Sequence, residues 1–200
     1  MKNKLKYFIC AIVLLGGILS CERYELYRGQ DARLGFSTDT VFFDTIFTTI
    51  GSTTRNFRIY NHYDQPLEIS SIELAGGPSS VFRINVDGYA ASSVSNVEIP
   101  PKDSLYVFVE VTLDPNNHDS LLVIYDSIVF NTNGNLQDVN LVAWGQDVHL
   151  FRRDTIGTST WINDKPYLVV DYLIVDSLET LTIKEGVRIH MHRDAVLIFK

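Results

Sequence analysis

The sequence predicts an all-β protein, in which a β-sandwich is followed by a stack of shorter strands. Three observations support this fold class. Every second residue from Leu105 to Leu113 is aliphatic, which is the period of a strand that buries one face. Asn133-Gly134 lies between two alternating runs, and this dipeptide favours the type I′ turn of a β-hairpin because both residues tolerate a positive φ. No sustained helical period occurs between residues 36 and 145.

The chain begins with a basic flank, an apolar run and a cysteine. Lysines occupy positions 2, 4 and 6, and the apolar run extends from Tyr7 to Leu19. This run is long enough to engage a secretion channel but short for a permanent transmembrane helix. With Ser20 before Cys21 and Ile18 three positions upstream, the first 21 residues resemble a bacterial lipoprotein signal, although Leu19 is bulkier than usual. The resemblance implies that Cys21 is acylated; the alternative is an ordinary secretory signal in which this cysteine has no role.

The cysteine content agrees with export and lipidation. Cys10 and Cys21 are the two cysteines, so none remains after the signal and no disulfide is expected. An exported body of this length can be stable on its hydrophobic core alone. Several acyl chains on Cys21 would hold the protein on a membrane, whereas a single chain anchors only marginally. Glu22 is not the aspartate associated with inner-membrane retention, and Glu22 and Glu25 resemble surface-export determinants. We therefore expect an outer-membrane protein that faces the periplasm or the cell surface.

Charge argues against a nucleic-acid partner. The chain has 17 Lys and Arg and 24 Asp and Glu, and the signal holds three of the lysines and none of the acids. The remainder carries 14 basic and 24 acidic residues, a net charge of −10. An acidic surface repels phosphates, and the sequence has no basic stripe to neutralise them. The expected partners are the membrane, through lipidated Cys21, and a glycan or an envelope protein.

Residues 22–35 are polar and short, which indicates a tether. Residues 36–146 alternate strand patterns with turn residues, which predicts about seven strands in a β-sandwich. The buried parity changes between Ile69 and Ile72, so a bulge is expected near Ser70-Ser71. The expected strands are 40–47 with a kink, 55–60, 67–74, 82–86, 105–113, 124–130 and 139–143.

Several segments of this region match one branch of immunoglobulin-like domains. They are Phe43-Asp44-Thr45, Gly51-Ser52, Phe57-Arg58-Ile59-Tyr60-Asn61, Pro66-Leu67-Glu68-Ile69 and Ile99-Pro100-Pro101-Lys102-Asp103-Ser104-Leu105. In this order they resemble the hydin-like (ASH) domains, in which an asparagine closes the second strand and proline-leucine opens the third. The resemblance covers residues 36–146 and implies a spacer or a binding module without chemistry of its own. The alternative is an unrelated sandwich of seven strands.

Residues 147–200 change character, because short apolar runs of two to five residues alternate with single polar or glycine corners. This spacing favours stacked solenoid coils over hairpins. The run 181–189 resembles a coil of the right-handed parallel β-helices of bacterial lipoproteins. The resemblance implies an inward set, Leu181, Ile183, Val187, Ile189 and Met191, and an outward set, Lys184, Arg188, His190 and His192.

The open apolar end of such a stack needs a cover, and Trp161 is the candidate at its start, with a plain core aromatic as the alternative. The last run, ending at Phe199, is the most apolar of the segment and has no capping residues after it. We therefore expect the chain to be the amino-terminal part of a longer product. If 200 residues are the whole length, this segment is instead a small appendage packed on the sandwich.

No catalytic residue, cofactor or metal is predicted. His190 and His192 share a strand face that can hold a metal, but no cysteine remains and no acid follows them on that strand. A calcium loop at 114–119 lacks its central glycine, and Gly51-Ser52-Thr53 lacks the second glycine of a nucleophile elbow. No phosphate loop or dinucleotide fingerprint is present in the sequence.

Four tyrosines are candidates for a sugar-stacking platform, although tyrosine is also an ordinary sheet residue. They are Tyr60, Tyr63, Tyr89 and Tyr106. The favoured function is a non-catalytic envelope lipoprotein that acts as a binding or structural module. The alternatives are the amino-terminal part of a β-helix polysaccharide lyase or hydrolase, and an adaptor subunit of an envelope complex.

Overall fold

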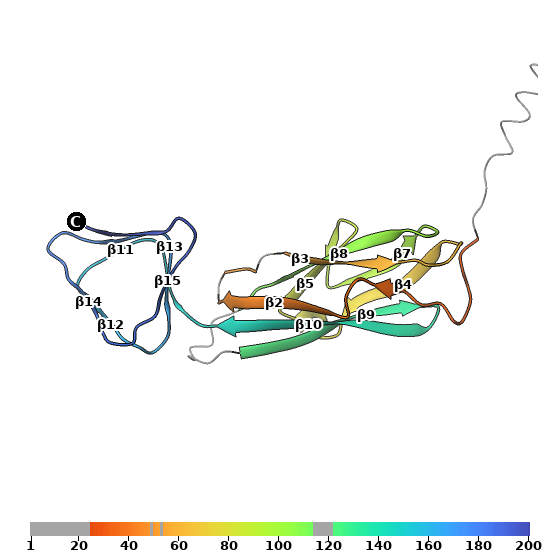
Figure 1. Ribbon diagram of the computed structural model, residues 1–200, viewed down its shortest axis with the longest axis horizontal. Coiled ribbons are helices and arrows are strands. Elements are labelled where there is room, and N and C mark those ends of the chain that lie inside the picture. Colours follow the sequence, from red (N-terminus) through yellow and green to blue (C-terminus); the bar gives the residue numbers. More distant parts are fainter. Residues whose placement is uncertain (1–24, 49, 53, 114–121) are drawn as a thin grey trace, which may run out of the picture.

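The computed structural model describes residues 25–48, 50–52, 54–113 and 122–200, and this part of the chain is almost entirely β-structure (Figure 1). Two five-stranded sheets form an immunoglobulin-like sandwich, and a stack of parallel strands follows it. The first sheet has the order β1 (Gly35–Phe36), β3 (Arg55–Tyr60), β8 (Ser104–Val111), β5 (Phe82–Val86), β6 (Tyr89–Ala91). The second has the order β2 (Thr40–Phe47), β10 (Asn135–Gln146), β9 (Leu122–Thr132), β4 (Leu67–Leu74), β7 (Ser93–Ile99).

The all-β prediction is confirmed, but the described residues of the sandwich form ten strands and not about seven. The additional strands are β1, β6 and β7. β7 has the sequence Ser-Val-Ser-Asn-Val-Glu-Ile, which offers a core little apolar surface, and it forms because β4 pairs with it along the sheet edge. A single 3₁₀ turn, η1 (Gly77–Ser79), joins β4 to β5.

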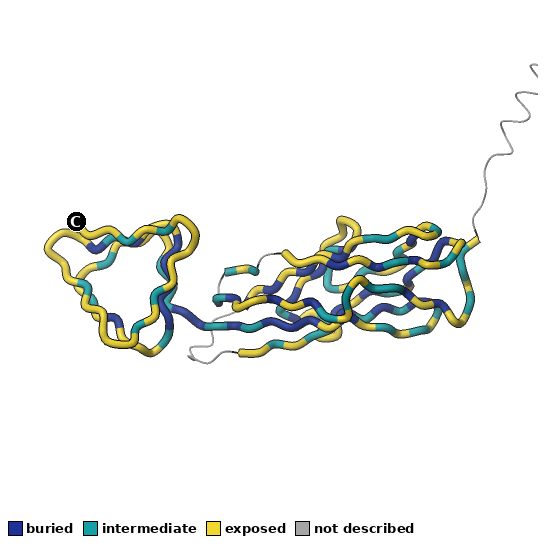
Figure 2. The backbone as a smooth tube through the Cα atoms, in the orientation of Figure 1, coloured by how far each residue is buried: buried dark blue, intermediate teal, exposed yellow. Residues whose placement is uncertain are grey.

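The period-two pattern buries one face of each sheet in a shared core. In β8, Val107, Val109 and Val111 are fully buried and the residues between them are exposed. In Figure 2 the buried positions recur along the strands of both sheets. The largest fully buried side chains of the sandwich are Phe43, Phe57, Phe82, Phe130, Ile59, Leu67, Ile69, Ile72, Ile84, Ile99, Ile128 and Leu141.

The predicted hairpin turn is confirmed, whereas the predicted bulge near Ser70-Ser71 is not observed. Asn133 and Gly134, which join β9 to β10, have φ values of 50° and 85°, as a type I′ turn requires. Ile69 and Ile72 are both buried despite their opposite parity. β4 keeps one register with β7 on both sides of Ser70, so one pair is missing there but neither strand has the extra residue of a bulge.

The segment 25–34, assigned to the tether by its polarity, is packed along the sandwich. Ala32 and Leu34 are buried in the core. The amides of three side chains on and beside β10 hydrogen-bond its backbone: Asn133 to residues 27 and 29, Asn135 to 30 and 32, and Gln137 to 34 in both directions. This segment reaches the sandwich at the end far from the parallel strands (Figure 1).

The remaining strands are β11 (His149–Ile156), β12 (Ser159–Trp161), β13 (Tyr167–Val175), β14 (Leu181–Ile183), β15 (Ile189–Met191) and β16 (Val196–Phe199), and we call residues 149–199 the C-terminal stack. All of their pairings are parallel: β13 pairs with β11, β15 and β16, and β12 pairs with β14. Successive turns of the chain therefore lie on one another, and Figure 1 shows them as a triangle.

β11 and β13 are longer than the predicted two to five residues, because each continues around a corner. Arg153 in β11 and Asp171 in β13 have φ values of 51° and 64°. The two corner residues lie on adjacent turns, and the Arg153 Nε is 2.9 Å from the Asp171 carboxylate. The parallel pairing of β11 with β13 shifts by one residue at this corner, between Arg152 and Asp154, and then continues on the next side of the triangle.

The interior of the C-terminal stack differs in part from the predicted inward set. Leu181, Val187 and Ile189 pack against a core of Trp161, Tyr167, Val169 and Leu173, as expected. Ile183 and Met191 are 45% and 44% exposed, because β14 and β15 are the last described strands on their sides of the stack and no described strand covers them. The rings of Trp161 and Tyr167 stack at 4.2 Å, so Trp161 is a core aromatic within the stack.

Candidate functional site

The sandwich and the C-terminal stack meet at a buried polar joint. Only Asp147 and Val148 separate the end of β10 from the start of β11, and both are buried. The Asp147 carboxylate accepts hydrogen bonds from the Thr48 hydroxyl (2.8 Å) and the Val148 N–H (2.9 Å). It also accepts one from the Lys165 ammonium (3.2 Å), which comes from the loop between β12 and β13. Asp147 thus joins the end of β2, the link and the C-terminal stack.

Electrostatics keep this carboxylate ionised. Burial of Asp147 raises its pKa, but the hydrogen bonds from Thr48, Lys165 and Val148 together lower the pKa below its ordinary value. Asp164, in the loop that carries Lys165, is affected in the same way. Desolvation raises its pKa, but the hydrogen bonds with His149 and with backbone N–H groups together lower the pKa below its ordinary value. Both acids hold the loop 162–166 in place, Asp147 through its contact with Lys165 and Asp164 through its contact with His149.

An apolar cluster surrounds the polar joint. Val148, Leu168 and Val170 are buried, and Phe47 and Ile50 of the sandwich pack against them. The ring of Phe47 also lies 5.1 Å from the ring of His190. Side chains from both parts of the molecule therefore share one small core, which holds the C-terminal stack on the end of the sandwich.

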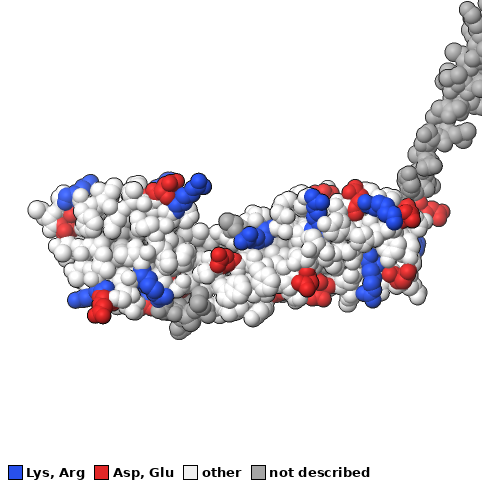
Figure 3. Space-filling view, in the orientation of Figure 1, with Lys and Arg blue, Asp and Glu red and all other residues white. Residues whose placement is uncertain are grey.

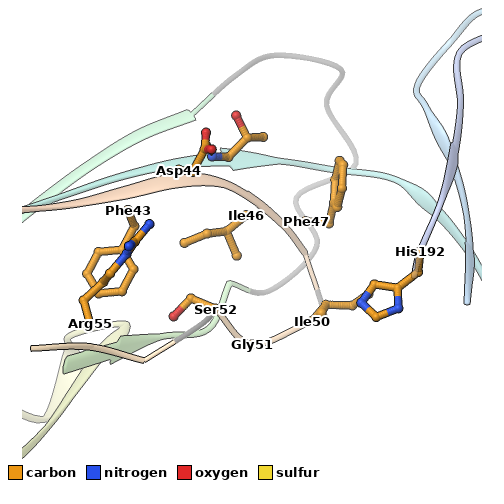
Figure 4. Close-up of a pocket in the computed structure, with 10 residues that line it drawn as sticks. Phe43, Asp44, Ile46, Phe47, Ile50, Gly51, Ser52, Arg55 and His192 are labelled. Carbon is orange, nitrogen blue, oxygen red and sulfur yellow. The ribbon is translucent and has the colours of Figure 1, made fainter. Parts of the chain in front are cut away.

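A cavity of about 340 Å³ lies beside this joint (Figure 4). Phe43 and Arg55 lie at one end of it and His192 at the other, with Ile50 next to His192. Asp44, Thr45 and Ser52 add polar groups to the lining, and Ile46, Phe47 and Gly51 complete it. Domain junctions are a common place for ligand sites, but Asp44 and Ser52 are already hydrogen-bonded to backbone N–H groups. This leaves few free polar groups in the cavity.

The predicted metal and catalytic candidates are distributed as follows. Cys21 and the loop 114–119 lie outside the described residues. His190 packs on Phe47 and His192 lines the junction cavity. The Ser52 hydroxyl accepts a hydrogen bond from the Val111 N–H and so has a structural role. Within the described ranges, no three His, Cys, Asp or Glu side chains are grouped as metal ligands require, and no helix has the length and hydropathy of a membrane span.

The four candidate tyrosines do not share one platform. Tyr60 stacks on His62, and Tyr63 stacks on Tyr27 at 3.9 Å. Tyr89 is 70% exposed on β6, at the sheet edge. Only Tyr106 lies in the middle of a sheet face.

An aromatic pair on β8 extends the surface around Tyr106. Tyr106 and Phe108 are stacked with ring centroids 5.9 Å apart, and they are 41% and 39% exposed. The guanidinium of Arg58 lies 4.4 Å from the Tyr106 ring and also hydrogen-bonds its hydroxyl, which raises the pKa of Arg58. Sequence reasoning did not single out Phe108, although the alternation of 105–113 already places it with Tyr106 on the face opposite the core.

Charge on the molecular surface is mixed. Figure 3 shows lysine and arginine interspersed with aspartate and glutamate on the face in view. Exposed ion pairs join several of these groups, among them Lys102 with Asp64 at 3.2 Å. The figure therefore gives no large patch of one sign on this face.

Comparison with known proteins gives a fold likeness only. No family model matches the chain, and no curated protein sequence matches it. A family 123 glycoside hydrolase from Clostridium perfringens matches at 6% identity and a TM-score of 0.41, over 62% of this chain and 31% of that chain. The E. coli chaperone DraB matches at 11% identity and a TM-score of 0.37, over 60% of this chain and 55% of that chain.

A third solved structure is the ASH/PapD-like domain 7 of human CEP192, at 7% identity and a TM-score of 0.35, over 57% of this chain and 84% of that domain. The chain spans less than two thirds of both the hydrolase and the chaperone. At this level of likeness neither activity nor partner transfers to the present chain, and the immunoglobulin-like class follows from its own two-sheet topology.

Proposed function

We propose that this protein is a lipid-anchored envelope protein in which an ASH-like sandwich acts as a rigid stalk for the C-terminal stack. We infer further that the parallel strands are the first turns of a right-handed parallel β-helix. The observation that carries the stalk role is the placement of the two attachment points. The segment from residue 25 docks at one end of the sandwich, and the stack is fixed to the other end.

The dimensions support a stalk. Cys21 is followed by only three residues before the docked segment begins, a reach of about 14 Å when extended. β10 runs the length of the sandwich with 12 residues, which corresponds to about 40 Å. The short connection to Cys21 and the long sandwich would hold the C-terminal stack well away from the lipid surface.

The joint at Asp147 supports rigidity. A flexible linker would be exposed and rich in glycine, proline or polar residues. Here the link has two buried residues, an ion pair to Lys165 and an apolar contact cluster. The sandwich and the C-terminal stack would therefore move as one rigid body.

The anchor is tested by metabolic labelling with radioactive palmitate. The wild-type protein should take up label and sediment with membranes, and Cys21→Ala should do neither. A Cys21→Ala protein that sediments unchanged, together with an unlabelled wild type, would contradict the anchor.

The stalk is tested by energy transfer from tryptophan to dansyl-labelled lipid, with the lipidated protein in vesicles. Trp144 and Trp161 lie near or beyond the joint, so little transfer is expected. The control is a Tyr27→Trp variant, whose new indole lies at the docked end and should transfer strongly. If tryptophans at positions 27, 144 and 161 transferred energy equally, the protein would lie flat on the membrane, and the stalk role would be wrong.

A further inference from the structure

The outer face of the β3–β8–β5 sheet has a strip of aromatic and amide side chains. Phe108 on the central strand β8 is flanked in register by Asn56 of β3 and Asn85 of β5. Tyr106, two residues along β8, stacks beside it. An aromatic surface bordered by amides on both sides can contact an apolar ring face and hydrogen-bond the ring's substituents at the same time.

A cavity of about 230 Å³ opens beside Phe108. Its polar lining includes Glu110, whose carboxylate accepts a hydrogen bond from the Thr54 hydroxyl at 2.5 Å, and Arg83, which lies opposite Glu110 in register. Arg83 donates to two backbone carbonyls, so its charge is held in place. One positive and one negative side chain line the cavity, which therefore favours an uncharged ligand.

Asn85 also lines this cavity, and its carboxamide oxygen is buried without a hydrogen-bond partner among the described residues. A buried polar atom of this kind destabilises the fold unless a partner is supplied. A donor group on a bound molecule, met by a small rotation of the amide, would supply that partner. The amide thus indicates a ligand with hydroxyl or N–H groups.

The sheet itself excludes a common mode of peptide binding. β8 is paired on both sides, with β3 and β5, so its backbone offers no free edge for an added strand. A ligand on this face must be held by side chains alone. Stacking on a ring combined with hydrogen bonds to amide and carboxylate groups suits a molecule with apolar C–H faces and a rim of hydroxyls.

We propose that this face is a glycan-binding site, in which one neutral sugar ring occupies the cavity against Phe108 and the next extends toward Tyr106 and the Arg58 guanidinium that lies over its ring. Asn85, Glu110 and Asn56 accept or donate hydrogen bonds to the sugar hydroxyls. This goes beyond the stalk role proposed above, because it gives the sandwich a ligand of its own. It does not depend on lipidation, because every residue of the site comes from β3, β5 and β8 and the residues beside them.

The site is tested by isothermal titration calorimetry of the full chain, kept in a polyoxyethylene detergent that has no sugar headgroup. The probes are cellohexaose, mannohexaose and chitohexaose. At least one should bind, and Phe108→Ala should weaken that binding about tenfold or more. Phe108→Tyr keeps the ring and should retain affinity within about threefold.

Two controls separate binding from folding. Phe42→Ala removes an equally apolar ring, 58% exposed on the outer face of the other sheet, and should leave affinity unchanged. Asn85→Leu removes the unpartnered amide, so it should lower affinity while the melting temperature stays constant or rises, which a purely structural asparagine would not do.

The proposal is wrong if none of the three oligosaccharides binds at about 5 mM, or if binding survives Phe108→Ala in a folded protein. Failure here is distinguishable from failure of the anchor. A lipidated protein that binds no glycan contradicts only this site, and a wild-type protein that binds glycan but takes up no palmitate contradicts only the anchor.

Discussion

Asp147 is the residue on which the shape of the molecule depends most. Its side chain is 1% exposed, and the partner side chain of Lys165 is 15% exposed. A buried charge is tolerated only when hydrogen bonds and an opposite charge replace the water it has lost. Asp147 meets this condition with contacts from three separate segments, so the joint is specific to one relative placement of sandwich and stack.

Replacement of Asp147 by asparagine should lower the free energy of unfolding by about 2 kcal/mol, because the Lys165 ammonium loses its counter-charge in a mostly buried position. Urea denaturation followed by circular dichroism measures this. The matched control is Arg193→Ala, which removes an exposed pair with Asp194 and should have no measurable effect. Equal effects of the two substitutions would contradict the importance of the joint.

Stability should also depend on pH through Asp147. Its pKa is lower in the folded protein than the ordinary value of 3.8, so the unfolded state binds more protons as the solution is acidified. The stabilising contribution is complete above the unfolded pKa and is lost as pH falls through the folded one. Unfolding free energies measured between pH 7 and pH 3 should fall at the acid end, and the fall should be smaller in Asp147→Asn.

At the level of elements, the β9–β10 hairpin has two roles. Its turn reverses the chain through Asn133 and Gly134 in the left-handed region. Beside that turn, Asn133, Asn135 and Gln137 present amides that bind the backbone of the segment 27–34. One hairpin therefore organises the second sheet and also fixes the exit of the chain toward its amino terminus.

Gly134→Ala should lower the free energy of unfolding by about 1 kcal/mol, because alanine is strained at a φ of 85° even though no atom lies within 4 Å of the added Cβ. Gly157→Ala is the matched control, since its Cβ would meet only ordinary contacts at 3.7 Å and more. That variant should stay within about 0.5 kcal/mol of wild type in the same denaturation experiment. A Gly134→Ala protein as stable as Gly157→Ala would contradict the type I′ turn.

At the scale of the whole molecule, two cores are joined by a third. The sandwich core and the core around Trp161 are separate clusters, and the small cluster of Val148, Leu168 and Val170 connects them. Each turn of the C-terminal stack is covered only by the turns next to it. Contact with the stable sandwich therefore adds to the stability of the stack. The joint provides that contact.

The two parts should therefore unfold together. In a Trp144→Phe variant, Trp161 is the sole tryptophan and reports on the stack, while circular dichroism reports on all strands. The two urea transitions should coincide in this background. After Asp147→Ala they should separate, with the Trp161 signal lost first. Separate transitions before the second substitution would contradict the coupling.

The strand pattern and its turns were predictable because they depend on neighbours in sequence. Alternation of Leu105 to Leu113 and the Asn133-Gly134 dipeptide determine β8 and the hairpin with no reference to the rest of the chain. The aromatic strip was predictable in part, since the same alternation exposes Tyr106 and Phe108. Strand β7 was missed because its polar residues form a strand only once β4 is present to pair with them.

The sequence alone determined the all-β class, the period of the strands and the corners between them, which are local consequences of side-chain shape and polarity. Only the tertiary structure decided which residues meet across long separations. Asp147 binds Lys165 and Thr48. Phe108 lies between Asn56 and Asn85. The polar segment 25–34 docks on β10. These contacts depend on sheet order and register, and no spacing along the chain encodes them because each joins strands that topology brings together.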